Sequence, residues 1–98
     1  MTKRDLPALS IIELRDSLRR GEISPGEVLQ ALEERINAVD SEIGSYLVRD
    51  FATATSEAKK ADVSLPLGGI PIAIKDLINV EGQQCSCASK ILRGYRAS

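Results

Sequence analysis

The amino-acid sequence predicts an α/β protein in which N-terminal helices precede the first strands of a sheet. Two segments with apolar residues at helical spacing, each preceded by a serine, lie within residues 10–40. Residues 70–74 form an apolar run without alternation, which is typical of a strand covered on both faces. Such a strand needs neighbours that 98 residues do not supply, so we expect the sheet to be incomplete in this chain.

Composition and charge exclude several classes of protein. The 43% hydrophobic content is ordinary for a globular chain, which excludes disorder over most of the length. The net charge of −1 gives no concentrated positive field for gripping nucleic acid. No apolar run approaches the roughly 20 residues that span a bilayer, and no secretory signal is recognisable. We therefore expect a cytoplasmic protein with no membrane partner, in which Cys85 and Cys87 are thiols without a metal.

The first predicted helix has recognisable signals at both ends. Ser10 is a good N-cap, and Glu13 three residues later makes a capping box. Gly21 is suited to a left-handed stop after the last turn. The expected inner face consists of Ile11, Leu14 and Leu18.

The second predicted helix repeats these signals. Ser24 caps it, Pro25 takes the first helical position, and Glu27 completes a second box. Its apolar stripe consists of Val28, Leu32, Ile36 and Val39. Because the link between the two helices is short, we expect a helical hairpin over about residues 10–40.

A first strand and a third helix are expected over about residues 45–62. Tyr46-Leu47-Val48 is the strand, and the helix runs over residues 51–62. The inner face of that helix is expected to consist of Phe51, Ala54, Ala58 and Ala61. A loop over 63–70 leads to a second strand over about 70–80, and a short helix is expected near 88–92.

Lys75 directly follows the apolar run and is the candidate catalytic residue. Burial at the end of an interior strand would favour a neutral amine, which can act as a general base or nucleophile. Active sites of α/β proteins also gather at strand ends. The alternative is a lysine whose ammonium reaches solvent along its apolar stem. From the pattern alone, that alternative is the simpler interpretation.

The motifs around Lys75 resemble those of the amidase signature family. Residues 68–76 read Gly-Gly-Ile-Pro-Ile-Ala-Ile-Lys-Asp, and 79–82 and 87–90 continue in the same register. Within the family, the Cys-Ala-Ser-Lys-Ile-Leu stretch and the N-terminal pattern are most similar to A subunits of aspartyl/glutamyl-tRNA amidotransferases. The resemblance covers nearly the whole chain and implies the N-terminal part of an amidase domain with a mixed sheet.

The resemblance implies a Ser–Ser–Lys triad, in which Lys75 matches the lysine. It places both triad serines downstream of residue 98, so we expect this chain alone to be inactive. Ser86 and Ser89 are explained by helix capping, Ser98 is terminal, and Lys90 is expected in solvent.

The resemblance further implies a protein that hydrolyses glutamine and supplies ammonia to amidate Glu-tRNA(Gln) or Asp-tRNA(Asn). The B and C subunits would be its partners, and charged tRNA would bind through the complex. The A subunit would need no cofactor, since ATP and Mg would be used by one of its partners. Two alternatives stay open: a stand-alone amidase of the same family, and a non-catalytic helical binding module.

Overall fold

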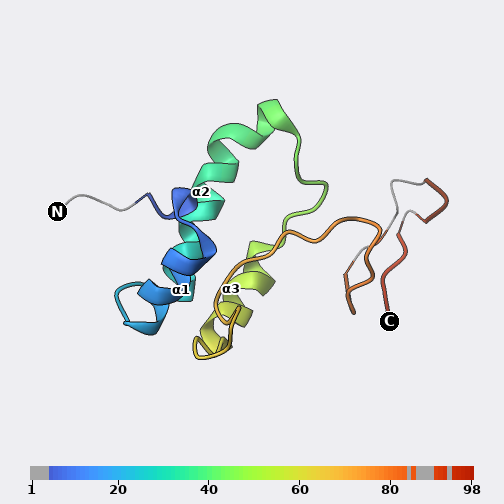
Figure 1. The fold of residues 1–98 in the computed structure, drawn as a ribbon. Coiled ribbons are helices and arrows are strands. Elements are labelled where there is room, and N and C mark those ends of the chain that lie inside the picture. Colours follow the sequence, from blue (N-terminus) through green and yellow to red (C-terminus); the bar gives the residue numbers. More distant parts are fainter. Residues whose placement is uncertain (1–4, 84, 86–89, 93) are drawn as a thin grey trace.

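The computed structural model describes residues 5–83, 85, 90–92 and 94–98. In chain order its elements are η1 (Leu6–Ala8), α1 (Ile11–Arg19), α2 (Pro25–Ile43), α3 (Phe51–Lys60) and η2 (Lys90–Leu92). The three α-helices gather at one end, and an extended segment leaves them toward the C terminus (Figure 1). The radius of gyration is 15.0 Å, against about 13 Å for a compact domain of this length.

The predicted capping box of α1 is confirmed. The Ser10 hydroxyl accepts from the backbone N–H of Glu13 at 3.1 Å, and the Glu13 carboxylate accepts from the Ser10 N–H at 3.3 Å. Gly21 has a φ of 74°, as expected for the residue that ends this helical segment. Ile11, however, was expected on the inner face and is 56% exposed. It lies in the first turn, beyond the part of α1 that the core covers.

Helix α2 begins with the predicted serine cap but closes it differently. The Ser24 hydroxyl accepts from the Glu27 N–H at 3.2 Å, while the Glu27 carboxylate accepts from that hydroxyl at 3.4 Å. Pro25 occupies the first turn, where its missing N–H costs nothing. Gly44 ends the helix with a φ of 70°.

The core lies where η1, α1, the link to α2 and the start of α2 meet. Its buried side chains are Leu6, Leu14, Leu18, Ile23 and Val28. Partly buried apolar residues border it, and two of them, Val63 and Ile70, come from the loop after α3. The core is therefore shared between the helices and the loop that leads toward Lys75.

Helix α3 packs on α2, and small residues make up most of its half-buried face. Its half-buried positions are those predicted for the inner face: Phe51, Ala54 and Ala58, followed by Ala61 just beyond the helix. The Asp50 carboxylate caps the helix by accepting from the Thr53 N–H at 3.0 Å and the Thr53 hydroxyl at 2.7 Å. These bonds hold the pKa of Asp50 below its usual value. The helix ends at Lys60, two residues before the predicted boundary.

The predicted strands at 46–48 and 70–74 do not form in the part of the chain that the structure describes. Neither segment has a ladder partner among the described residues, and their large side chains are exposed, with Leu47 at 75% and Ile72 at 62%. The described fold is thus mostly helical, and the strands of the predicted α/β class are not shown. Of the helix predicted near 88–92, the structure describes the short turn η2, and the remainder lies outside the described residues.

Arg19 of α1 makes two side-chain hydrogen bonds to the loop after α3. The Arg19 guanidinium donates to the carbonyl of Val63 at 3.3 Å and to that of Ser64 at 3.2 Å. These carbonyls lie 44 and 45 residues along the chain from Arg19. The contact therefore fixes where the loop begins its path across the helices.

Two glycines let this loop turn tightly against its surroundings. A Cβ at Gly68 would collide with the backbone carbonyl of Asp62. Gly69 has a φ of 82°, and a Cβ there would approach the Pro25 ring to 3.0 Å and a Leu18 methyl to 3.4 Å. The Gly-Gly pair is thus required by the local backbone path, whatever its relation to chemistry.

No helix among the described residues is both long and apolar enough to cross a membrane.

Replacing Gly68 by alanine tests the close approach. We expect Gly68→Ala to lower the free energy of unfolding by about 1–3 kcal/mol, because backbone must shift to admit the Cβ. Gly26→Ala is the matched control, since a Cβ at this helical position meets only the Ser24 hydroxyl, at 3.9 Å. The control should be neutral or stabilising by up to about 1 kcal/mol. Urea unfolding of both variants measures the difference, and equal stabilities would contradict the steric account.

Candidate functional site

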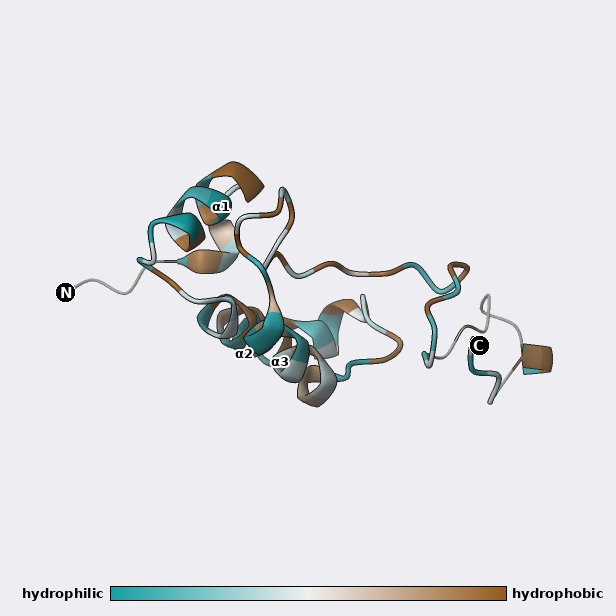
Figure 2. Cartoon of the chain, turned by 90° about the horizontal axis from the view of Figure 1, so that it is seen from below, coloured by the Kyte–Doolittle hydropathy of each residue, from teal (hydrophilic) through white to brown (hydrophobic). Residues whose placement is uncertain are grey.

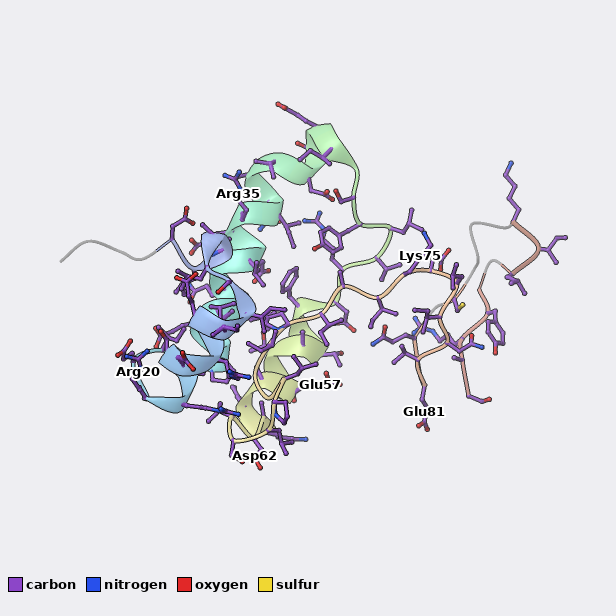
Figure 3. The ribbon with its side chains drawn as sticks, in the orientation of Figure 1. Arg20, Arg35, Glu57, Asp62, Lys75 and Glu81 are labelled. Atoms are coloured by element: carbon purple, nitrogen blue, oxygen red, sulfur yellow. The ribbon has the colours of Figure 1, made fainter. Side chains whose placement is uncertain are left out.

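Lys75 lies at the end of the extended segment and opens a turn. Its backbone carbonyl accepts from the N–H of Ile78 at 3.0 Å, which closes the turn over residues 75–78. Its side chain is exposed. Figure 3 shows Lys75 apart from the helices that carry Arg35 and Glu57. The lysine is therefore presented on a turn beyond the helical end of the molecule.

The surroundings of Lys75 differ from the buried strand that the sequence predicted. The apolar side chains on either side of it are exposed: Ile72 at 62%, Ile74 at 47%, Leu77 at 58% and Ile78 at 50%. Figure 2 shows the hydrophobic colouring that runs along this segment after it leaves the helices. The predicted burial is wrong for the described chain, because no described element covers either face of the segment.

The turn is held from its far side by Cys85. The Cys85 thiol donates to the carbonyl of Asp76 at 2.9 Å, and the side chain is 3% exposed. Two successive carbonyls, those of Lys75 and Asp76, thus accept hydrogen bonds. From the sequence, this cysteine was expected only as a thiol without a metal. No local pattern in the sequence indicated this contact, which joins residues nine positions apart.

The residues before Cys85 pair with the end of the described chain. The Gly82 N–H donates to the Ala97 carbonyl at 2.7 Å, and the Ala97 N–H donates to the Gln83 carbonyl at 2.9 Å. The Arg96 guanidinium donates to the Gly82 carbonyl at 3.0 Å. We call residues 82, 83, 85, 96 and 97 the clamp. Two residues of the clamp are buried: Cys85 is 3% exposed and Ala97 is 5% exposed.

The loop that delivers the lysine segment begins at an acidic turn. The Asp62 carboxylate accepts from the Ser64 N–H at 3.0 Å and from the Ser64 hydroxyl at 2.6 Å. These bonds stabilise the ionised form and hold the pKa of Asp62 below its usual value. The turn precedes Gly68 and Gly69, so it sets the start of the tight path described above.

The other residues that the sequence offered as candidates are not gathered around Lys75. Ser98 is exposed, and Lys90 is exposed as predicted. Ser86, Ser89 and Cys87 lie outside the described residues. Among the residues that the structure does describe, no group of three or more acidic or cysteine side chains could hold a metal ion. The described site thus consists of one lysine on a braced turn.

The comparisons with known proteins identify the class. The family model described as "Amidase" matches residues 27–98, which include Gly68, Gly69, Lys75 and the clamp. This match covers most of the chain, and the chain therefore belongs to the amidase family.

Curated relatives carry a more particular description. The chain is 53% identical over 89 residues to a protein of Methylacidiphilum infernorum that is named as the A subunit of glutamyl-tRNA(Gln) amidotransferase. Proteins of the same name from Clostridium botulinum (strain Okra) and Roseiflexus castenholzii are 45% and 42% identical. These matches cover 91%, 93% and 89% of this chain but only 18%, 20% and 19% of the relatives. The chain thus spans about one fifth of the length of these relatives.

The Asp62 turn predicts a local dependence on pH. A lowered folded-state pKa means that ionised Asp62 stabilises the turn above the unfolded value of about 3.9. This contribution is lost as pH falls through the folded value. We expect the Ser64 amide resonance to titrate with a midpoint below about 3.9.

NMR spectra between about pH 2 and 7 measure this titration, a range that brackets the ordinary aspartate pKa. Asp62→Asn is the control, because its amide does not ionise and the Ser64 titration should vanish. A Ser64 midpoint at or above the ordinary aspartate value would contradict the assignment.

Proposed function

We propose that this chain is the N-terminal part of the glutamine-hydrolysing A subunit of a tRNA-dependent amidotransferase. The observation that carries the proposal is the family match over residues 27–98 together with relatives of that name. In this proposal the protein releases ammonia from glutamine. A partner then uses the ammonia to convert Glu-tRNA(Gln) to Gln-tRNA(Gln), or Asp-tRNA(Asn) to Asn-tRNA(Asn).

Lys75 is the proposed terminal base of a Ser–Ser–Lys triad. The neutral amine accepts a proton through a bridging serine as the nucleophilic serine oxygen attacks the glutamine side-chain carbonyl. The C–N bond then breaks, and the proton returned from the lysine leaves with ammonia. Water hydrolyses the resulting acyl-enzyme to glutamate in the same manner. Both serines and the backbone donors for the oxyanion are contributed by sequence beyond this chain.

The exposed apolar segment supports a site that is completed by further sequence. Removal from water favours a neutral lysine, and the exposed side chains of Ile72 and Ile74 offer surface that another layer can cover. Covering these side chains would place the amine in the desolvated surroundings that the mechanism needs. On this basis the 98-residue chain alone is inactive, and the full-length protein is the active unit.

Partners and cofactors follow from the same proposal. The A subunit works in the cytoplasm with B and C subunits in a heterotrimer, and charged tRNA binds through the complex. It uses no cofactor of its own, since ATP and Mg serve the partner that activates the tRNA-bound carboxylate. A stand-alone amidase would share the family match, but the names of the similar relatives favour the tRNA-dependent complex. The family match also disfavours a non-catalytic binding module.

Substituting the lysine tests the catalytic assignment. In the full-length protein, Lys75→Ala should lower the rate of glutamine hydrolysis by about 10³-fold or more, because the triad loses its base. Lys90→Ala is the control, since Lys90 is exposed on η2. Ammonia release measures both variants, and circular dichroism checks their folding. Turnover near the wild-type rate in a folded Lys75→Ala protein would eliminate the proposed base.

The assignment to a complex is tested by co-purification. Tagged full-length protein, expressed in the organism that encodes it, should co-purify with two further subunits at equal stoichiometry. The isolated 98-residue chain should release no ammonia from glutamine under the same assay. A full-length protein that hydrolyses small amides while remaining a single polypeptide would favour the stand-alone amidase.

A further inference from the structure

The turn that carries Lys75 is held between two anchors. On its N-terminal side, Ile70 packs against the helical core and its N–H donates to the Leu67 carbonyl at 3.1 Å. On its C-terminal side, the Cys85 thiol donates to the Asp76 carbonyl at 2.9 Å. Between these anchors the side chains at 72–75 are exposed, so packing within the described chain does not orient the lysine.

Cys85 is suited to this role by its burial and by what holds it. It is 3% exposed, and Gly82 and Gln83, just before it, are paired with Ala97 through backbone bonds of 2.7 and 2.9 Å. The thiol is therefore presented from a braced backbone, and its target is the carbonyl of the residue directly after the lysine. A shift of the Asp76 peptide would rotate the backbone from which the Lys75 side chain projects.

We propose that Cys85 is a positioning residue for the reaction in which Lys75 is the base. Its thiol, on the backbone that Gly82 and Gln83 pair with Ala97, fixes the Asp76 carbonyl and with it the direction in which the amine leaves the turn. This inference rests on the proposed function. Cys85 does not contact substrate in this role. The thiol hydrogen bond orients Lys75, and the volume of the Cys85 side chain does not.

Three substitutions separate the donor from the packing. Cys85→Ser keeps a small donor, Cys85→Ala removes the donor and some volume, and Cys85→Val removes the donor while filling the space. In full-length protein we expect kcat for glutamine hydrolysis to fall about tenfold in the alanine and valine variants. KM should stay within about twofold, because the lysine acts on the chemical step. The serine variant should retain the wild-type kcat.

Two patterns would overturn the inference. If valine restores kcat while serine does not, the side chain acts by packing. If all three variants keep the wild-type kcat, the thiol does not position the lysine. Thermal unfolding of each variant identifies loss of fold, and the serine and alanine pair then still decides between donor and volume. Lys75→Ala, assayed in parallel, separates a failure of the proposed function from a failure of the positioning role. If Lys75→Ala is fully active, the proposed catalytic role of Lys75 is wrong. If Lys75→Ala is inactive and the Cys85 variants are normal, only the positioning role is wrong.

Discussion

The guanidinium of Arg19 holds together parts of the chain that are far apart in sequence. By donating to the carbonyls of Val63 and Ser64, it ties the last turn of α1 to the loop after α3. Gly68 and Gly69 then let the loop turn closely against Asp62 and Leu18. Ile70, the next residue, packs against the core, so the lysine segment leaves the helices from this point.

The chemistry that we assign to Lys75 depends on two kinds of support. One is mechanical and present in the described chain: the core at Ile70 and the clamp at Cys85 bracket the turn. The other is the exclusion of water, and the exposed side chains at 72, 74, 77 and 78 show that the described residues do not provide it. Under the proposed function, a further layer covers this apolar segment, and Lys75 acts as a base once that layer is in place.

Local features of the fold were predictable from the sequence, and long-range ones were not. The serine caps, Gly21 and the inner face of α3 follow from rules that act within a few residues, and the structure agrees with them. The apolar run at 70–74 predicted a buried strand, and that prediction is wrong for the described chain, because a strand exists only when a neighbour pairs with it. Ile11 was misplaced because the pattern cannot tell how far along a helix the core extends. Lys75 was reached through its motif, and that assignment stays a prediction. The contacts of Arg19 and Cys85 carry no periodic signal, since each joins a side chain to a distant backbone carbonyl.

Hydrogen exchange in the loop tests most directly whether Arg19 fixes the departure of the lysine segment. The N–H groups of Gly68 and Ile70 donate to the Leu65 and Leu67 carbonyls, both at 3.1 Å, and they report on the loop. Arg19→Ala should speed exchange at both amides about fivefold, as expected when a stabilising hydrogen bond is lost. Arg20→Ala is the matched control, because the Arg20 guanidinium contacts Asp16 and Glu22, which lie close to it in sequence. Unchanged exchange at Gly68 and Ile70 in Arg19→Ala, or an equal increase in Arg20→Ala, would contradict the account.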